Sequence, residues 1–214
     1  MRSTLDGPGN EDVNLHVASF SQEWDSLSQW RAYSGPTSGF ALGFSADRLD
    51  LPERFTILHC IYEPDRQNKV AEAIVGEVLD RALAQIPAVS LSNATTTAWA
   101  GLLSELHTFA LMFKHPKFHE EEEWRIVSPV RDYTPPAYPV ALDTELAFRQ
   151  GKSMPIPYLS FLLNPDKDQF PLAEVVIGPN PNPEQSSRSA SGLLRSERLE
   201  RVRVRRSEIP YRNW

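Results

Sequence analysis

The chain has 214 residues, a hydrophobic fraction of 41%, a formal net charge of −6 and one cysteine. This length fits one domain, and the hydrophobic fraction is too large for a disordered chain. The net charge gives no global field that would favour nucleic acid or anionic lipid, and a single cysteine excludes an intramolecular disulfide framework or a cysteine-rich zinc site.

The N-terminal residues 1–12 are polar and contain glycine and proline, which predicts a flexible leader before a single α+β domain at 13–214. No apolar stretch approaches the roughly 20 residues of a membrane helix, and the start of the chain lacks the apolar centre of a secretory signal. Cys60 lies in an apolar run, which favours a buried, inert thiol over a reactive one. We therefore expect a cytoplasmic protein.

The first third of the chain predicts short strands around one helix. Val13, Leu15 and Val17 alternate with polar residues, as in a half-buried strand. Ser21 is the expected N-cap of a helix that carries Trp24 and Trp30. Two further strands are predicted at Phe40–Phe44 and Phe55–Tyr62, which are rich in aromatic and β-branched residues.

The middle of the chain predicts the two main helices. Apolar residues recur every three or four positions from Ala71 to Ile86, and Pro87 ends this pattern. A second helix is expected to begin with a cap at Thr95–Thr97 and to end before Pro116.

The last hundred residues predict strands separated by prolines. The predicted strands are Glu123–Val130, Thr144–Phe148, Tyr158–Leu163, Leu172–Ile177 and Leu199–Arg206. Asn182 followed by Pro183 is a helix-start signal, so the last two strands should be joined by a helical crossover within one sheet. The expected class is α+β with a mixed or antiparallel sheet core.

The acidic run Glu120–Glu123 precedes Trp124 and Arg125. On a strand, Glu121, Glu123 and Arg125 would share one face, where they could serve ribose hydroxyls, a metal or general-base chemistry. The alternative interpretation is an acidic turn before a strand, whose carboxylates Arg125 neutralises.

Three other places have both a functional and a plain interpretation. Arg31 and Tyr33 cannot share the Trp30 face of a helix and could point into a cleft. The turn at 178–183 precedes a helix N-terminus and is either an anion site or a plain loop. The arginines of the last strand either contact RNA, phosphate or another partner, or protect a solvated sheet edge; they are Arg201, Arg203 and Arg205. The histidine spacing supports no metal site.

Six short motifs in order resemble an uncharacterised bacterial domain family of unknown function. They are Ser19-Phe-Ser21, Trp30-x-x-Tyr33, Gly39-Phe40, Phe118-x-x-Glu-x-Glu-Trp-Arg125, Ile177-Gly-Pro179 and Ser207-x-Ile-Pro-Tyr-Arg212. The resemblance covers roughly residues 17–212 and implies no established activity.

A looser resemblance relates this family to ADP-ribosyltransferases, which use NAD as substrate. It implies Tyr33 as the residue that stacks on nicotinamide and Glu123 or Glu121 as the carboxylate that stabilises the cationic ribose. Ser21, Arg31 and Arg125 are the implied NAD contacts, and no metal is implied. Such a domain would modify a protein or nucleic-acid target, as a toxin or an anti-phage effector.

The family pattern opens with an aromatic-x-Tyr-Thr-Ser strand, and none precedes Val17. Either translation starts upstream of Met1, or the chain is a shortened member without a complete nucleotide site. Two alternatives to the transferase therefore stay open. One is a non-catalytic binding or sensing domain of the same family. The other is a metal-dependent nuclease that uses Glu121 and Glu123.

Overall fold

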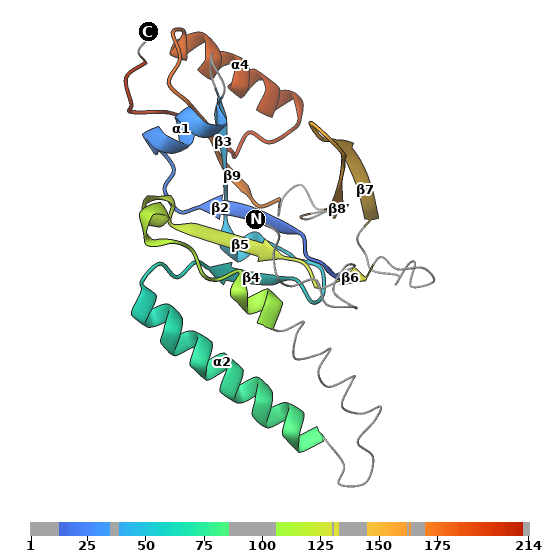
Figure 1. The fold of residues 1–214 in the computed structure, drawn as a ribbon. Coiled ribbons are helices and arrows are strands. Elements are labelled where there is room, and N and C mark those ends of the chain that lie inside the picture. The colour runs from blue at the N-terminus through green and yellow to red at the C-terminus, as the bar shows by residue number, and fades with distance from the viewer. Residues whose placement is uncertain are drawn as a thin grey trace. The chain divides into compact units, whose positions relative to one another are not determined.

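The computed structural model describes residues 13–34, 39–85, 106–129, 131–132, 145–161, 163 and 170–211 (Figure 1). The predicted leader at 1–12 lies outside these residues. The strands are β1 Val13–Asn14, β2 Val17–Ser21, β3 Phe40–Phe44, β4 Thr56–His59, β5 Glu123–Val127, β6 Arg131–Asp132, β7 Glu145–Gln150, β8 Pro155–Ser160, β9 Leu172–Ile177 and β10 Arg203–Arg206. The helices are α1 Leu27–Tyr33, α2 Pro64–Gln85 and α4 Pro183–Ser196, with short 3-10 helices η1 Ala46–Arg48 and η2 Pro116–Glu121.

Helices combine with antiparallel and mixed sheets, which confirms the predicted α+β class. The chain divides into two compact units. The first unit comprises Met1–Ser21 and Glu53–Leu159, and the second comprises Gln22–Pro52 and Ser160–Trp214. The single domain expected at 13–214 stays a prediction, and each unit is described by itself.

The first unit is built on the antiparallel sheet β2-β5-β4, with β5 in the middle (Figure 1). Ile126 and Val127 of β5 are buried, as is Leu58 of β4. The register places Glu123 opposite Ser21 and Arg125 opposite Ser19. Because directly opposed residues point to the same side of a sheet, the two serines share a face with Glu123 and Arg125.

The helix α2 confirms the first of the two helices predicted for the middle of the chain, although it begins earlier, at Pro64. Residues 106–110 are helical, and the remainder of the second predicted helix lies outside the described residues. In the part of the chain that the structure describes, no helix is both long and apolar enough to cross a membrane.

The second unit is built on the sheet β10-β9-β3 and the helix α4. β9 begins and ends where the sequence predicted, and β10 runs parallel to it after the α4 crossover. Asn182 is the N-cap of α4 and Pro183 its first residue, as expected. The hydrophobic core of this unit includes Leu172, Val175, Leu194 and Val202.

Several element boundaries differ from the prediction; the strand predicted at Tyr158–Leu163, for example, is β8 at Pro155–Ser160. Two of these differences have a structural cause. The first predicted helix begins at Leu27 with Ser26 as N-cap, not at Ser21, because the preceding residues form a turn in which Trp24 stacks on Arg205 instead of sharing a helix face with Trp30. β10 begins only at Arg203, because a turn with a left-handed Arg198 (φ 60°) follows α4.

Asp25 ties this turn to the end of the chain. Its Oδ1 accepts hydrogen bonds from Trp30 Nε1 at 2.7 Å and from Ser207 Oγ at 2.6 Å. Its Oδ2 accepts one from the Glu208 N–H at 2.7 Å. The Trp30 ring, fixed in this way, lies against Gly178, where a Cβ atom would come within 2.9 Å of the ring. Glycine at 178 therefore permits this close packing.

We expect Asp25→Ala to destabilise the second unit, because three donors lose their acceptor. The free energy of unfolding should fall by about 2 kcal/mol. For a chain of this size, the melting temperature should then fall by roughly 4–8 °C. Thermal unfolding followed by circular dichroism measures the change. The matched control is Asp50→Ala at an exposed position of the same unit; equal melting curves for the two variants would contradict the proposed role of Asp25.

Candidate functional site

Glu123, the predicted catalytic carboxylate, is the first residue of β5 and only 5% exposed. Both polar groups of its backbone are hydrogen-bonded to the segment that follows β4. The Glu123 N–H donates to Tyr62 Oη at 2.7 Å, and the Glu123 carbonyl accepts from the Cys60 N–H at 2.9 Å. The side chain therefore leaves the sheet from a rigid position.

The Glu123 carboxylate lies between two cations. Arg125 donates from Nε to Oε1 at 2.9 Å and from Nη2 to Oε2 at 3.2 Å. Lys114 Nζ also donates to Oε2, and the Ser19 side chain donates a further hydrogen bond. A carboxylate offers about four lone-pair sites, so these donors occupy its full accepting capacity.

The electrostatic consequence is a strongly acidic Glu123. Burial by itself would raise the pKa of this carboxyl group, but the hydrogen bonds from Arg125, Lys114 and Ser19 outweigh it and lower the pKa from 4.5 to about 2. Burial raises the pKa of the Cys60 thiol. Cys60 is 1% exposed, so the expectation of a buried thiol is confirmed.

Lys114 is the residue of this cluster that the sequence did not reveal. Its Nζ bridges Glu123 and Glu121 Oε2, the latter at 2.5 Å. Burial would lower the pKa of Lys114, but its bonds to the two carboxylates outweigh this and raise it. Gln67 of α2 holds the Lys114 backbone in place, because its Nε2 donates to the Lys114 carbonyl at 2.8 Å and to the Ile61 carbonyl at 2.6 Å.

Glu121 does not lie on a strand, which corrects the predicted Glu121–Glu123–Arg125 strand face. It is the last residue of η2, and Glu122 adopts a left-handed conformation (φ 38°) that separates it from β5. Ser21 donates from Oγ to the Glu121 carbonyl at 2.7 Å, and its role as an NAD contact stays a prediction. The alternative interpretation, an acidic turn before a strand, agrees with this geometry, although Arg125 contacts only Glu123 and Lys114 pairs with both carboxylates.

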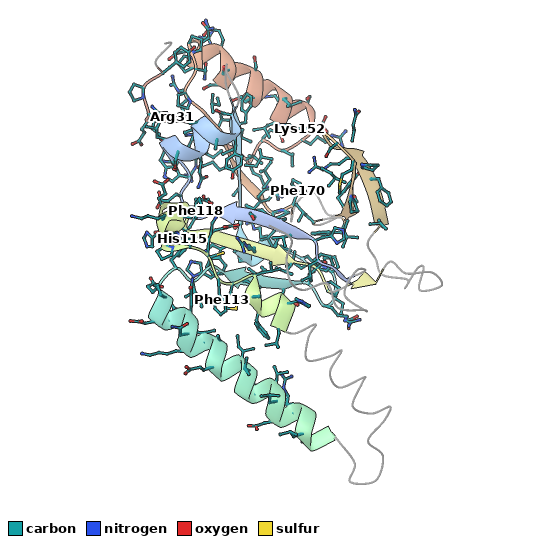
Figure 2. The ribbon with its side chains drawn as sticks, in the orientation of Figure 1. Arg31, Phe113, His115, Phe118, Lys152 and Phe170 are labelled. Atoms are coloured by element: carbon teal, nitrogen blue, oxygen red, sulfur yellow. The ribbon has the colours of Figure 1, made fainter. Side chains whose placement is uncertain are left out.

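Aromatic and histidine side chains line the outer side of this turn. His115 and Phe118 lie side by side in Figure 2, with 6.4 Å between ring centroids, and Lys114 Nζ is 5.1 Å from the Phe118 ring. His119 packs edge-on against Tyr62. Of these rings, Phe118 lies against Lys114, whose side chain is 16% exposed.

Tyr33 and Arg31, predicted for nicotinamide stacking and NAD binding, lie on α1 in the second unit. Tyr33 is 82% exposed, and Arg31 is also exposed. The two glutamates and Arg125 lie in the first unit. The expectation that Tyr33, the glutamates and Arg125 line one pocket therefore stays a prediction.

The turn at 178–183 satisfies its own polar groups. Asn180 is buried, and its Nδ2 donates to the Gly178 carbonyl at 2.9 Å. Its Oδ1 accepts from the Asn182 N–H at 2.9 Å and from Ser186 Oγ at 3.3 Å. These contacts favour the plain-loop interpretation over an anion site.

The three predicted partner-binding arginines have different surroundings. The Arg205 guanidinium stacks 3.6 Å from the Trp24 ring centroid and pairs with Glu174 at 3.5 Å. Arg201 donates to the Phe170 carbonyl at 2.8 Å. Arg203 is more exposed than Arg205, with 74% of its side chain accessible against 34%, and its contact to Glu174 is longer, at 3.7 Å.

The comparison with known families matches part of this chain. Residues 29–126 match the model of a family described as a protein of unknown function (DUF2971). The predicted resemblance to a family of unknown function is thereby confirmed for this segment, which contains Tyr33, Lys114, Glu123 and Arg125. The motifs at 177–179 and 207–212 lie beyond the matched residues. No curated protein and no solved structure matches the chain.

The low pKa of Glu123 makes stability depend on pH in a defined window. Because the pKa is about 2 in the folded state and near 4.5 ordinarily, Glu123 stabilises the fold above pH 4.5, and this contribution is lost as the pH falls towards 2. Its full value is about 3 kcal/mol, of which about 2 kcal/mol should be lost by pH 3. Urea unfolding at pH 7 and pH 3 measures the loss.

Glu123→Gln should remove this component of the pH dependence and lower stability at pH 7 by about 3 kcal/mol, since two half-buried cations lose their shared anion. Glu120→Gln, at an exposed position of the same acidic run, is the matched control and should behave as the wild type. If the wild type and Glu123→Gln respond equally to acid, the assigned role of Glu123 is wrong.

Proposed function

We propose that the chain is a non-catalytic binding domain. The observation that carries this proposal is the saturation of Glu123, the carboxylate that a transferase would need. Lys114, Arg125 and Ser19 take up its accepting capacity. A ribose hydroxyl could bind Glu123 only by displacing one of these partners.

The local charge also favours binding over transfer of ADP-ribose. A carboxylate stabilises a cationic ribose when its negative charge is directed at the reacting carbon without compensation. Here two cations, Lys114 and Arg125, contact Glu123, and Glu121 contributes only one further negative charge. Two cations and two anions leave no net negative charge in the cluster.

The same arrangement argues against the nuclease alternative. Lys114 Nζ lies between the Glu121 and Glu123 carboxylates, where a divalent ion bridging them would have to bind. Within the described parts of the chain, no group of three or more His, Cys, Asp or Glu side chains is placed to hold a metal. Metal binding would therefore require expulsion of the Lys114 ammonium group.

Arg203 is the position at which we expect a partner to be contacted. It stands on the outer strand β10 with most of its side chain accessible, whereas Arg205 is held between Trp24 and Glu174. A guanidinium in this position suits carboxylate or phosphate groups of a protein or nucleic-acid partner.

Nicotinamide release from NAD separates the proposed binding domain from the transferase. We expect no release by the wild type with a mixture of protein and nucleic-acid targets. Glu121→Gln, Glu123→Gln and Tyr33→Ala are the variants for comparison, each with its fold checked by circular dichroism. Release by the wild type that a folded Glu123→Gln or Glu121→Gln variant loses would overturn the proposal in favour of the transferase.

Partner binding is measured separately, with a labelled polyglutamate peptide and a labelled RNA oligonucleotide as probes of acidic partners. Binding of either probe should weaken with salt and with Arg203→Ala, because the contact is electrostatic. Arg66→Ala on the exposed side of α2 is the matched control. Equal affinity of the Arg203 and Arg66 variants would remove Arg203 from the proposed contact.

A further inference from the structure

The two outer strands of the sheet β10-β9-β3 differ in how they are protected. β10 has the sequence Arg-Val-Arg-Arg, and these charged side chains disfavour pairing of its outer edge with another strand. β3 reads Phe-Ala-Leu-Gly-Phe, without a charge or a proline. Among the described residues, β3 pairs only with β9. An uncharged outer strand is a template for pairing with another strand.

The backbone of β3 offers donors and acceptors at alternate residues. The Gly178 N–H donates to the Gly39 carbonyl at 2.9 Å, which makes these two residues a hydrogen-bonded antiparallel pair. Hydrogen-bonded and non-hydrogen-bonded pairs alternate along an antiparallel ladder, so Ala41 and Gly43 also bond towards β9. The N–H and carbonyl groups of Phe40 and Leu42 therefore point away from β9.

The side chains of these residues form an exposed apolar edge. Phe40 is 57% exposed and Leu42 is 55% exposed. Leu42 lies opposite Val175, a residue of the core with which Leu194 of α4 packs, and Phe44 packs against the same core. The exposed edge thus continues the apolar interior of the second unit.

The sequence of β3 is symmetric about Leu42. Phenylalanines stand at both ends, and the small residues Ala41 and Gly43 flank the centre. We propose that β3 pairs with β3 of a second copy of this chain, antiparallel about a two-fold axis that passes beside Leu42. The result is a continuous six-stranded sheet across two molecules.

In this register, large apolar side chains lie opposite each other on one face of the sheet and small residues lie opposite each other on the other face. Phe40 comes opposite Phe44 and Leu42 opposite its own copy on the face of α4, while Ala41 comes opposite Gly43 on the other face. Leu42, whose backbone points outward, comes into a hydrogen-bonded pair with its own copy, and Phe40 comes opposite Phe44, which lies beyond a shift in the register between β3 and β9 at Gly43 and Phe44. A shift by one residue would bring inward-bonded residues to the new interface and lose those bonds.

A second copy fits this edge better than an unrelated strand. A two-fold interface uses the same surface on both molecules, which the symmetric sequence of β3 provides. With no charge in β3, no like charges meet near the axis, although the chain carries a net charge of −6. Pairing also covers the unprotected edge of both copies at once.

Sedimentation of the full chain tests the pairing. The wild type should sediment as a species of twice the 24.2 kDa chain mass at micromolar concentration. Leu42→Lys should weaken the dimer by about 100-fold, since two like charges would meet at the axis. The matched control is Leu193→Lys, which places the same charge at a residue of α4 that is 63% exposed, and it should stay dimeric. Circular dichroism verifies that both variants fold.

Cysteine cross-linking tests the register independently. Cys60 is buried, so a new cysteine at position 42 is the reactive one. Mild oxidation should convert Leu42→Cys to a covalent dimer at least tenfold faster than Leu193→Cys. A monomeric wild type at about 100 µM, or equal cross-linking rates for the two variants, would overturn the proposal. Binding of an extended peptide to monomers through β3 would give that same monomeric result and identify a different occupant.

Discussion

The Glu123 carboxylate and its two cations are the interaction on which the first unit depends. The cations approach from different segments, because Arg125 lies on β5 and Lys114 follows the helical residues 106–110. Arg125 also donates to the Leu111 carbonyl at 2.6 Å, and Gln67 links Lys114 to α2. One buried carboxylate thereby joins the sheet to the segments that pack on it.

Burial of such a cluster is tolerated because its charges are paired and hydrogen-bonded. Moving ions out of water costs several kcal/mol each, and the cost is offset only with good geometry and with the other polar groups satisfied. Glu123 meets this condition at both its backbone and its side chain. Asp25 does the same in the second unit, where it accepts three hydrogen bonds from two separate segments, α1 and the residues that follow β10. In both units a buried network around an acidic side chain stabilises the fold. Because Glu123 has this structural role, we propose a binding domain and not an enzyme.

The sequence predicted the class and several elements well, because local signals determine them. The apolar and β-branched residues of Leu172–Ile177 and the Asn182-Pro183 start of α4 are properties of neighbouring residues, and both agree with the structure. Helix α1 was placed too early because Ser21 resembles an N-cap, whereas Asp25 and Trp24 are engaged by residues about 180 positions away. No local pattern carries that information.

The candidate site was predictable only in part. The contact between Arg125 and Glu123 follows from strand periodicity. Lys114 was missed because a single lysine between Phe113 and His115 has no motif around it. The sequence feature that could have indicated a second cation is the run of four glutamates at 120–123, because its negative charge exceeds what Arg125 alone can neutralise. The left-handed Glu122 could not be anticipated from residue type either, since glutamate seldom adopts that conformation.

The most direct test of the account is the ionisation of Glu123 itself. Carbon-13 NMR of labelled glutamate side chains, with Glu123→Gln to assign the resonance, gives the pKa of this carboxyl group in the folded protein. A carboxylate held by Lys114 and Arg125 should titrate with a pKa of about 2. A pKa near the ordinary 4.5 would show that the cations do not hold it, and would contradict both the structural role of Glu123 and the argument against catalysis.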